Sequence, residues 1–209
     1  MTVALDIRVL ELLCSRLCHE LVSPVGAVNN GVELIEEMGA DMADEAMGLI
    51  AHSAQQAARR LQVLRLAYGA AGTDASSFGE VRTAAANYLS GSKIALEWPA
   101  GVLDDALAGH RGFAKVLLNL IIMGEDALAY GGTLALVGSG GTVTVSARGR
   151  AAALKPDIRT AFDGACAPGD LSPRTVHAYA TGRFAENYGL SIAPSETPDR
   201  LDLQLSIAA

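Results

Sequence analysis

One histidine of the chain, His19, has neighbours that suggest a chemical role. It lies inside a long stretch with helical periodicity, and Arg16 precedes it by one helical turn. An imidazole nitrogen is a good nucleophile near neutral pH and can hold a phosphoryl group transiently. A guanidinium one turn away could steady phosphoryl oxygens, or it could be solvated or paired with Glu20. We predict that His19 carries the chemistry and that Arg16 assists it.

Two cysteines near His19 raise the alternative of a metal site. Cys14 and Cys18 are four residues apart, but His19 lies about 100° from Cys18 around a helix, and no fourth ligand is nearby. With Cys166 the chain has three cysteines, an odd number without framework spacing, which indicates reduced thiols. We expect this chain to bind no metal and no cofactor.

The first seventy residues have the pattern of two long helices. Apolar or small residues recur at alternating steps of three and four from Ile7 to Ile35, and again from Ala43 to Tyr68. Gly39 and Asp41 between them suit a helix end and a new N-cap. We predict an antiparallel hairpin over residues 1–70. Its apolar stripes are too wide for one partner helix, so we expect a homodimer that forms a four-helix bundle.

His19 falls on the outer side of the first helix, away from the predicted seam. At about 100° per residue, six residues share this side of the helix with His19: Ser15, Arg16, Val22, Ser23, Gly26 and Asn30. The side is mostly small and polar, so the backbone of another protein could come close to it. The alternative is a solvated surface histidine without a role. Pro24 removes one helical hydrogen bond, so either the helix bends there or two separate helices meet.

The residues from His19 to Val25 resemble the phosphoacceptor box of dimeric histidine kinases. The box reads His, acid, Leu, any residue, a small polar residue, Pro and an aliphatic, as this chain does. Together with 17–19 and 25–31, it resembles ChpT-type histidine phosphotransferases. The resemblance implies that Glu20 sets the tautomer of the His19 ring, and that Ser23 positions water or the partner's phosphoryl group. Glu20 as a surface charge, and Ser23 bonded to a carbonyl near Pro24, remain alternatives.

The pattern of the remaining residues predicts a linker of small residues and then a second domain. The linker spans 71–77, and the domain spans 78–209. Patterns in this domain predict helices at Phe78–Leu89, 112–129 and 173–188, and strands at 93–98, 133–137, 142–148, 190–193 and 200–207. The order indicates an α+β fold: the helical hairpin followed by a two-layer α/β sandwich. The sandwich resembles the ATP-binding domain of histidine kinases.

The nucleotide motifs of that domain are degraded. Asn119 matches the first asparagine of the kinase motif, and we expect it at a helix surface or as a helix cap. Met123 stands where the motif has the asparagine that binds magnesium, and a thioether has little affinity for this ion. Ala147 replaces the aspartate that would bind adenine, and Ala151 replaces a glycine. We expect no ATP binding. The glycine-rich run 138–141 between two strands predicts a hairpin turn rather than a phosphate loop.

The other histidines and the composition argue against further functional sites, a nucleic-acid partner and membrane binding. His52, His110 and His177 have no motif around them and are expected at the surface or satisfied in the core. The net charge is −7 and no basic stripe occurs, so we expect no nucleic-acid partner. No apolar run of about 18 residues occurs, so we expect a soluble, cytoplasmic protein that does not bind membranes.

The hypothesis is a dimeric phosphotransferase of two-component signal transduction without its own kinase activity. By resemblance, its donor is the receiver domain of a hybrid histidine kinase, its acceptors are response regulators of the cell cycle, and Mg²⁺ is held by the receiver. Two alternatives stay open from the sequence: a divergent ATP-dependent histidine kinase, and a non-catalytic dimeric interaction module.

Overall fold

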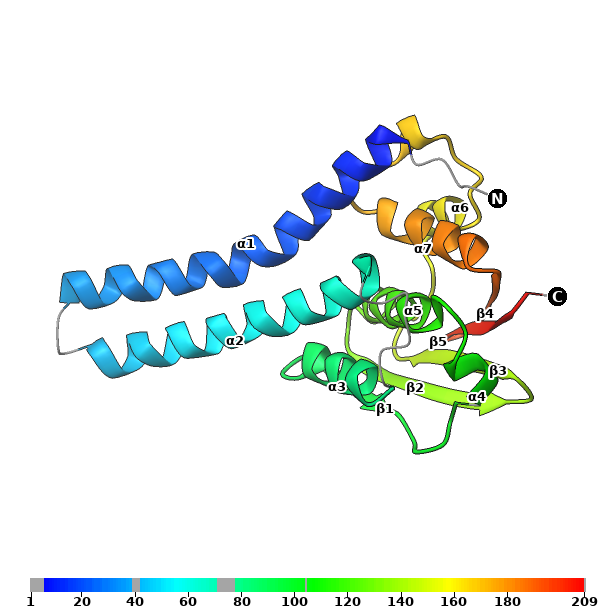
Figure 1. Cartoon of the computed structure of the whole chain (residues 1–209). Helices are drawn as coiled ribbons and strands as arrows, with labels where there is room; N and C mark the ends of the chain where they lie inside the picture. Colours follow the sequence, from blue (N-terminus) through cyan, green and yellow to red (C-terminus); the bar gives the residue numbers. More distant parts are fainter. Residues whose placement is uncertain (1–5, 39–41, 71–77, 104, 209) are drawn as a thin grey trace.

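The structure is a computed structural model that describes residues 6–38, 42–70, 78–103 and 105–208. Gly39, Asp41 and the predicted linker 71–77 lie outside the described residues. Helix α1 (Ile7–Met38) and helix α2 (Ala43–Tyr68) run antiparallel and project from a mixed α/β body (Figure 1). The predicted helical hairpin is confirmed, and both helices begin at the residue where their periodicity begins.

Pro24 lies inside α1, which continues through it. The alternative of two separate helices is therefore wrong. Proline cannot donate a hydrogen bond to the carbonyl of Glu20, and Figure 1 shows that α1 bends along its course. The bend lets the N-terminal part of α1 lie against the α/β body while the remainder pairs with α2.

Small buried residues bring α1 and α2 close together along the hairpin seam. Gly31 on α1 lies against Ala46 and Ile50 on α2. A Cβ atom at Gly31 would stand 2.6 Å from the Ile50 Cγ1 and 3.3 Å from the Ala46 carbonyl oxygen. The glycine at this position therefore sets the approach of the two helices.

We predict opposite effects for alanine at two glycines of α1. Gly31→Ala should lower the free energy of unfolding by about 1–3 kcal/mol, because the helices must move apart. Gly26→Ala should raise it by about 0.5–1 kcal/mol, since nothing lies within 4 Å of its Cβ position and alanine favours a helix. Urea unfolding at one protein concentration measures both, and a stabilising Gly31→Ala would contradict this packing.

The body contains one five-stranded sheet with strand order β1-β2-β3-β5-β4. Strand β1 is parallel to β2, and the other neighbours are antiparallel. The bounds of the strands are β1 Ile94–Glu97, β2 Gly132–Ser139, β3 Thr142–Arg148, β4 Leu190–Thr197 and β5 Arg200–Ile207. Gly140 and Gly141 have positive φ angles between β2 and β3, so the predicted hairpin turn is confirmed.

The helices of the body pack on one face of this sheet. Residues 143, 145, 147, 201, 203 and 205 are buried and share the face of β3 and β5 that the helices cover. The covering helices are α3 (Phe78–Leu89), α5 (Phe113–Ala127) and α7 (Val176–Asn187). The predicted α+β fold with a two-layer sandwich is confirmed. The sequence patterns missed α4 (Asp105–Ala108), α6 (Pro156–Phe162) and a 3₁₀ turn at Pro168–Asp170.

Both helices of the hairpin are anchored to the body. Near its C-terminal end, α2 contributes Val63, Leu66 and Ala67 to the same hydrophobic core as α5 and the sheet. Near its N-terminal end, α1 packs Val9 and Leu12 in a second, smaller cluster whose other buried members come from α6, α7 and the segment between them: Ala161, Leu171 and Val176. Helix α1, which carries His19, is therefore fixed to the body on the N-terminal side of its bend.

Two buried polar side chains of α5 reach the C-terminal end of α2. The Asn119 amide nitrogen donates to the Ala67 carbonyl at 2.8 Å, and the Lys115 ammonium donates to the Gly69 carbonyl at 2.5 Å. Last-turn carbonyls of a helix lack intrahelical partners, so these side chains satisfy them. Asn119 is fully buried. The prediction of a surface position is wrong, and the role as a cap is right, although the helix that it caps is α2.

Lys115 should make the stability of the fold depend on pH. Burial lowers its pKa from 10.5 to about 8. Between these values the unfolded chain keeps a proton that the folded chain has lost, so the free energy of unfolding should rise with pH. Urea unfolding of the native chain and of Lys115→Met at each pH gives the difference between their free energies of unfolding. We expect this difference to shift by about 1–2 kcal/mol in favour of the native chain between pH 7.5 and pH 9.5. A constant or shrinking difference would contradict the burial of the charge.

Candidate functional site

His19 is exposed about halfway along α1, beyond the part that packs on the body. Within the described residues, its ring makes no hydrogen bond and no ion pair. The ring is therefore accessible to a reacting group on another protein. Its backbone is held in a continuous helix that packs on α2 along one face and on the body near its N-terminal end, which fixes the direction in which the side chain leaves the helix.

The surface of α1 divides into three faces. One face packs on α2 and includes Glu20, Pro24 and Gly31. A second face is apolar and exposed, and includes Leu10, Val25 and Val32. The third contains His19. At about 100° per residue, His19 lies roughly opposite the boundary between the other two faces, as the alternating steps of three and four residues predict.

The face around His19 holds most of the predicted site residues. Val22, Ser23, Gly26 and Asn30 are all exposed. Gly26 lies two turns beyond His19, and no atom lies within 4 Å of its Cβ position. These residues form a shallow, open strip along α1, which we call the His19 strip: His19, Val22, Ser23, Gly26 and Asn30. A flat protein surface can approach the backbone of α1 along this strip.

Glu20 points away from the His19 strip and across the hairpin seam. Its carboxylate is ion-paired with the Arg60 guanidinium of α2, and both side chains are about one-third exposed. The charge next to His19 is therefore positioned by the second helix of the hairpin, forty residues further along the chain.

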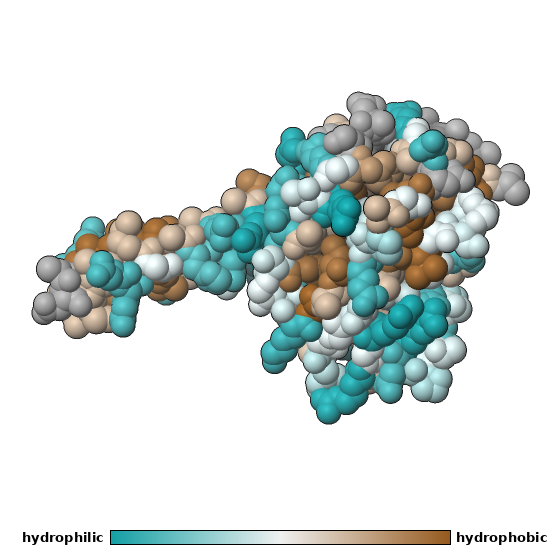
Figure 2. Space-filling model, turned by 90° about the horizontal axis from the view of Figure 1, so that it is seen from below, coloured by the Kyte–Doolittle hydropathy of each residue, from teal (hydrophilic) through white to brown (hydrophobic). Residues whose placement is uncertain are grey.

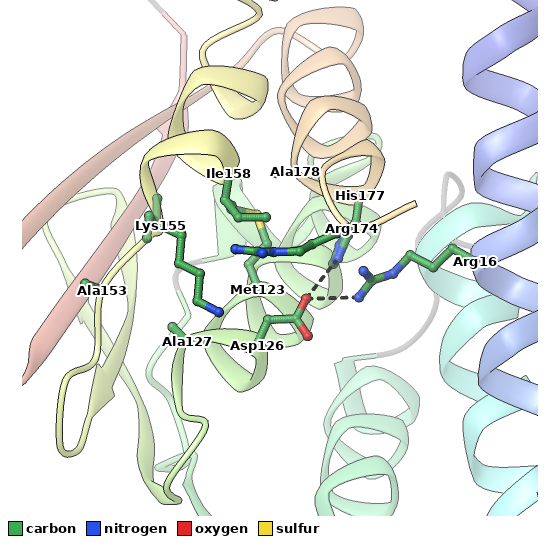
Figure 3. A pocket seen from close by; sticks show the side chains of 11 residues that line it. Arg16, Met123, Asp126, Ala127, Ala153, Lys155, Ile158, Arg174, His177 and Ala178 are labelled. Carbon is green, nitrogen blue, oxygen red and sulfur yellow. Dashed lines mark hydrogen bonds and ion pairs between the residues drawn. The ribbon is translucent and has the colours of Figure 1, made fainter. Parts of the chain in front are cut away.

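Arg16 points from α1 into the junction with the body (Figure 3). Its guanidinium donates to the Asp126 carboxylate of α5 at 2.9 Å, and its side chain is only 15% exposed. Neither alternative that the sequence left for Arg16, solvation or pairing with Glu20, is right. The Arg16 guanidinium and the neighbouring His177 hold the pKa of the Asp126 carboxyl below its usual range, against the effect of burial. The ion pair therefore persists at neutral pH.

A chain of polar contacts continues from Asp126 into the body. The His177 ring of α7 is buried, and its Nδ1 lies 3.8 Å from the Asp126 carboxylate. Its Nε2 lies 3.1 Å from the Asn119 amide oxygen, and Asn119 also bonds α2. Burial lowers the pKa of His177, so the ring is neutral. His177 was expected at the surface or satisfied in the core: it is in the core, but Nδ1 has no hydrogen bond within the described residues.

Sequence reasoning missed Asp126 and His177 as members of one network. Neither residue belongs to a local motif, and the contact between them joins two helices that are about fifty residues apart in the chain. The sequence offered one signal for Asp126: it follows Asn119 and Met123 on the same predicted helix, which is the helix that resembles the kinase motif. Met123 and Ala147, two of the residues that depart from that motif, are both buried.

Residues 78–200 match the family model for the C-terminal domain of histidine phosphotransferases. The chain belongs to the histidine phosphotransferase family. It is 35% identical over 202 residues to protein phosphotransferase ChpT of Brucella abortus, covering 94% of this chain and 93% of that one. The expected resemblance to this family is therefore confirmed.

One solved structure agrees with this assignment. A bacterial phosphotransferase solved at 1.7 Å matches with a TM-score of 0.80 and 32% identity, over 98% of each chain. The histidine kinase AdeS of Acinetobacter baumannii matches with a TM-score of 0.40 and 14% identity, over 91% of this chain and 97% of that one. The matches to phosphotransferases do not favour the two alternatives, a kinase and a non-catalytic module. Within the described residues, no helix of this phosphotransferase is long and apolar enough to cross a membrane.

Proposed function

We propose that this histidine phosphotransferase relays a phosphoryl group through His19, from the receiver domain of a hybrid histidine kinase to response regulators. The observation that carries the proposal is the ring of His19, which is exposed on an open strip of α1 and has no hydrogen bond or ion pair to any described residue, in a chain of this family. A nucleophile that serves two partner proteins in turn must be reachable by both, and the His19 strip offers such access.

The transfer step forms one bond and breaks one. A lone pair on Nε2 of His19 attacks the phosphorus of the receiver's aspartyl phosphate, and the phosphorus–oxygen bond breaks with its electrons on the aspartate carboxylate. The second step reverses this at the aspartate of a response regulator. Such transfers require alignment and charge neutralisation more than covalent help. We propose that Mg²⁺ is supplied by the receiver and that this chain contributes position.

The neighbours of His19 have distinct proposed roles. Glu20 is paired with Arg60 across the seam, so we propose that its carboxylate leaves Arg60 to accept from Nδ1 of His19 and favour the tautomer in which Nε2 is free. Ser23 lies one turn after His19 on the same strip and is positioned to bond a phosphoryl oxygen or water. Arg16 can reach a phosphoryl group only by leaving Asp126, so we propose that its main contribution is to hold α1 on the body.

We further propose that the protein acts as a homodimer. The exposed apolar face of the hairpin carries side chains that are 42–57% exposed: Leu10, Val25, Val32, Met47 and Leu61. Figure 2 shows apolar residues, in brown, at the surface of the projecting hairpin. A second hairpin against this face would complete a four-helix bundle and remove the apolar area from water.

Charge on this face should separate the subunits. Val25→Glu combined with Leu61→Glu places four like charges in the dimer interface, and we expect a monomeric mass at micromolar concentration. Light scattering measures the mass. Glu33→Gln, an exposed change on α1 outside the apolar face, serves as the control. A monomeric mass for the unmodified chain would contradict the proposed dimer.

Phosphotransfer profiling tests the proposed function. Purified receiver domains carrying labelled phosphoryl groups are mixed with this chain, and the label is followed to response regulators. We expect label to leave the cognate receiver and to reach a regulator only when this chain is present. The chain alone with labelled ATP should stay unlabelled, because the nucleotide motifs are degraded. Autophosphorylation from ATP would instead support a kinase.

A further inference from the structure

A cavity of about 220 Å³ lies where α1, α5 and α7 meet the segment before α6 (Figure 3). We call it the junction cavity. Its floor is apolar and includes Met123, Leu154 and Ile158. Pockets for drug-sized ligands measure roughly 300–1,000 Å³, so this cavity suits a compact molecule. The relay through His19 does not use it.

Three cationic side chains from three segments line the junction cavity. Arg16 comes from α1, Lys155 precedes α6, and Arg174 precedes α7. Arg16 is paired with Asp126, and Arg174 is paired with Asp157. Within the described residues, the Lys155 ammonium has no ion pair or hydrogen bond. The cavity therefore has an excess of positive charge in a chain whose net charge is −7.

His177 also lines this cavity and has a buried polar atom without a hydrogen bond among the described residues. Nδ1 of His177 has no hydrogen bond within the described part of the chain, although the side chain is only 2% exposed. The nearest carboxylate oxygen, on Asp126, is 3.8 Å away, beyond hydrogen-bond length. The Nε2–H of the neutral ring donates to the Asn119 amide oxygen, so Nδ1 is an acceptor: it cannot bond an oxyanion, but it can accept a hydrogen bond from a hydroxyl or a water in the cavity.

We propose that the junction cavity binds a small organic anion. Its compact apolar body would lie on Met123, Leu154 and Ile158, and its oxyanion group would be held by Lys155 with Arg174. An oxyanion between a free ammonium and a guanidinium is matched in charge and in hydrogen bonding. A phosphate ester and a carboxylate share this chemistry. The proposal does not depend on the role of His19.

Methyl NMR of methionine tests the proposal directly. The chain has five methionines, and among those that the structure describes, Met123 is the one that lines the junction cavity. In protein labelled with ¹³C at the methionine methyl groups, Met123→Leu assigns the resonance. Phenyl phosphate, benzoate and phenol are then titrated separately. We expect a saturable shift of the Met123 methyl with at least one of the two anions, at least about tenfold tighter than with phenol, and the tighter anion identifies the oxyanion.

Two exposed lysines provide the matched comparison. Lys155→Ala should weaken binding of the tighter anion at least about tenfold, whereas Lys93→Ala, an exposed lysine that does not line the cavity, should leave it unchanged. Both side chains are exposed, so both variants are expected to fold. The absence of a saturable shift with either anion, equal binding of phenol, or equal affinity in Lys155→Ala and the unmodified chain would each overturn the proposal.

Discussion

Replacing His19 with glutamine should reduce the relay by at least about 1,000-fold. Glutamine has a similar length and keeps a polar surface, but its amide is not a nucleophile. His19 is exposed, and its ring makes no hydrogen bond or ion pair within the described residues, so the fold and the proposed dimer should not change. The measurement is the rate at which a labelled receiver loses its phosphoryl group to the chain and a response regulator gains it.

A second histidine supplies the control for this experiment. His52 is exposed on α2, where its ring bonds Gln56. His52→Gln should transfer at the native rate. If label still passes to the regulator through His19→Gln, then His19 is not the relay and another residue of the chain carries the phosphoryl group.

A large side chain at Gly26 should block transfer without touching the nucleophile. Gly26 lies two turns beyond His19 on the His19 strip, with open space around its Cβ position. Gly26→Leu would project a branched side chain where a receiver must approach the backbone. Misplacement of reacting groups by about 1 Å can cost 100-fold, so we expect a rate at least about 100-fold lower.

The matched control for Gly26 lies on the other helix of the hairpin. Gly48 on α2 is also exposed, with no atom within 4 Å of its Cβ position. Gly48→Leu should keep the native transfer rate, and both variants should keep the native mass in light scattering. Native transfer by Gly26→Leu would show that receivers do not dock along this strip.

The hairpin could be predicted because its periodicity is local. Steps of three and four place the apolar residues of α1 and α2 on fixed faces, so the outward direction of His19 follows from the sequence alone. The core strands of the sheet were predicted for the same reason. Helix α6 was missed: it has only seven residues, of which two are buried, so no periodic pattern develops.

The polar network between the hairpin and the body could not be predicted. Geometry around α1 places Arg16 only about 60° from His19, yet its long side chain reaches Asp126 on α5. Glu20 finds its partner forty residues away on α2. Such partners depend on how helices pack in three dimensions, which local spacing does not encode. The cavity at the junction was missed for this reason as well.

The chemical nature of the labelled intermediate tests the central claim most directly. The chain is incubated with a phosphorylated receiver, and the labelled peptide is identified after separation. The account predicts a phosphoryl group on His19 that is labile in acid and stable in alkali, and that moves to a response regulator when one is added. Label that is stable in acid, or that resides on any other residue, would contradict the account.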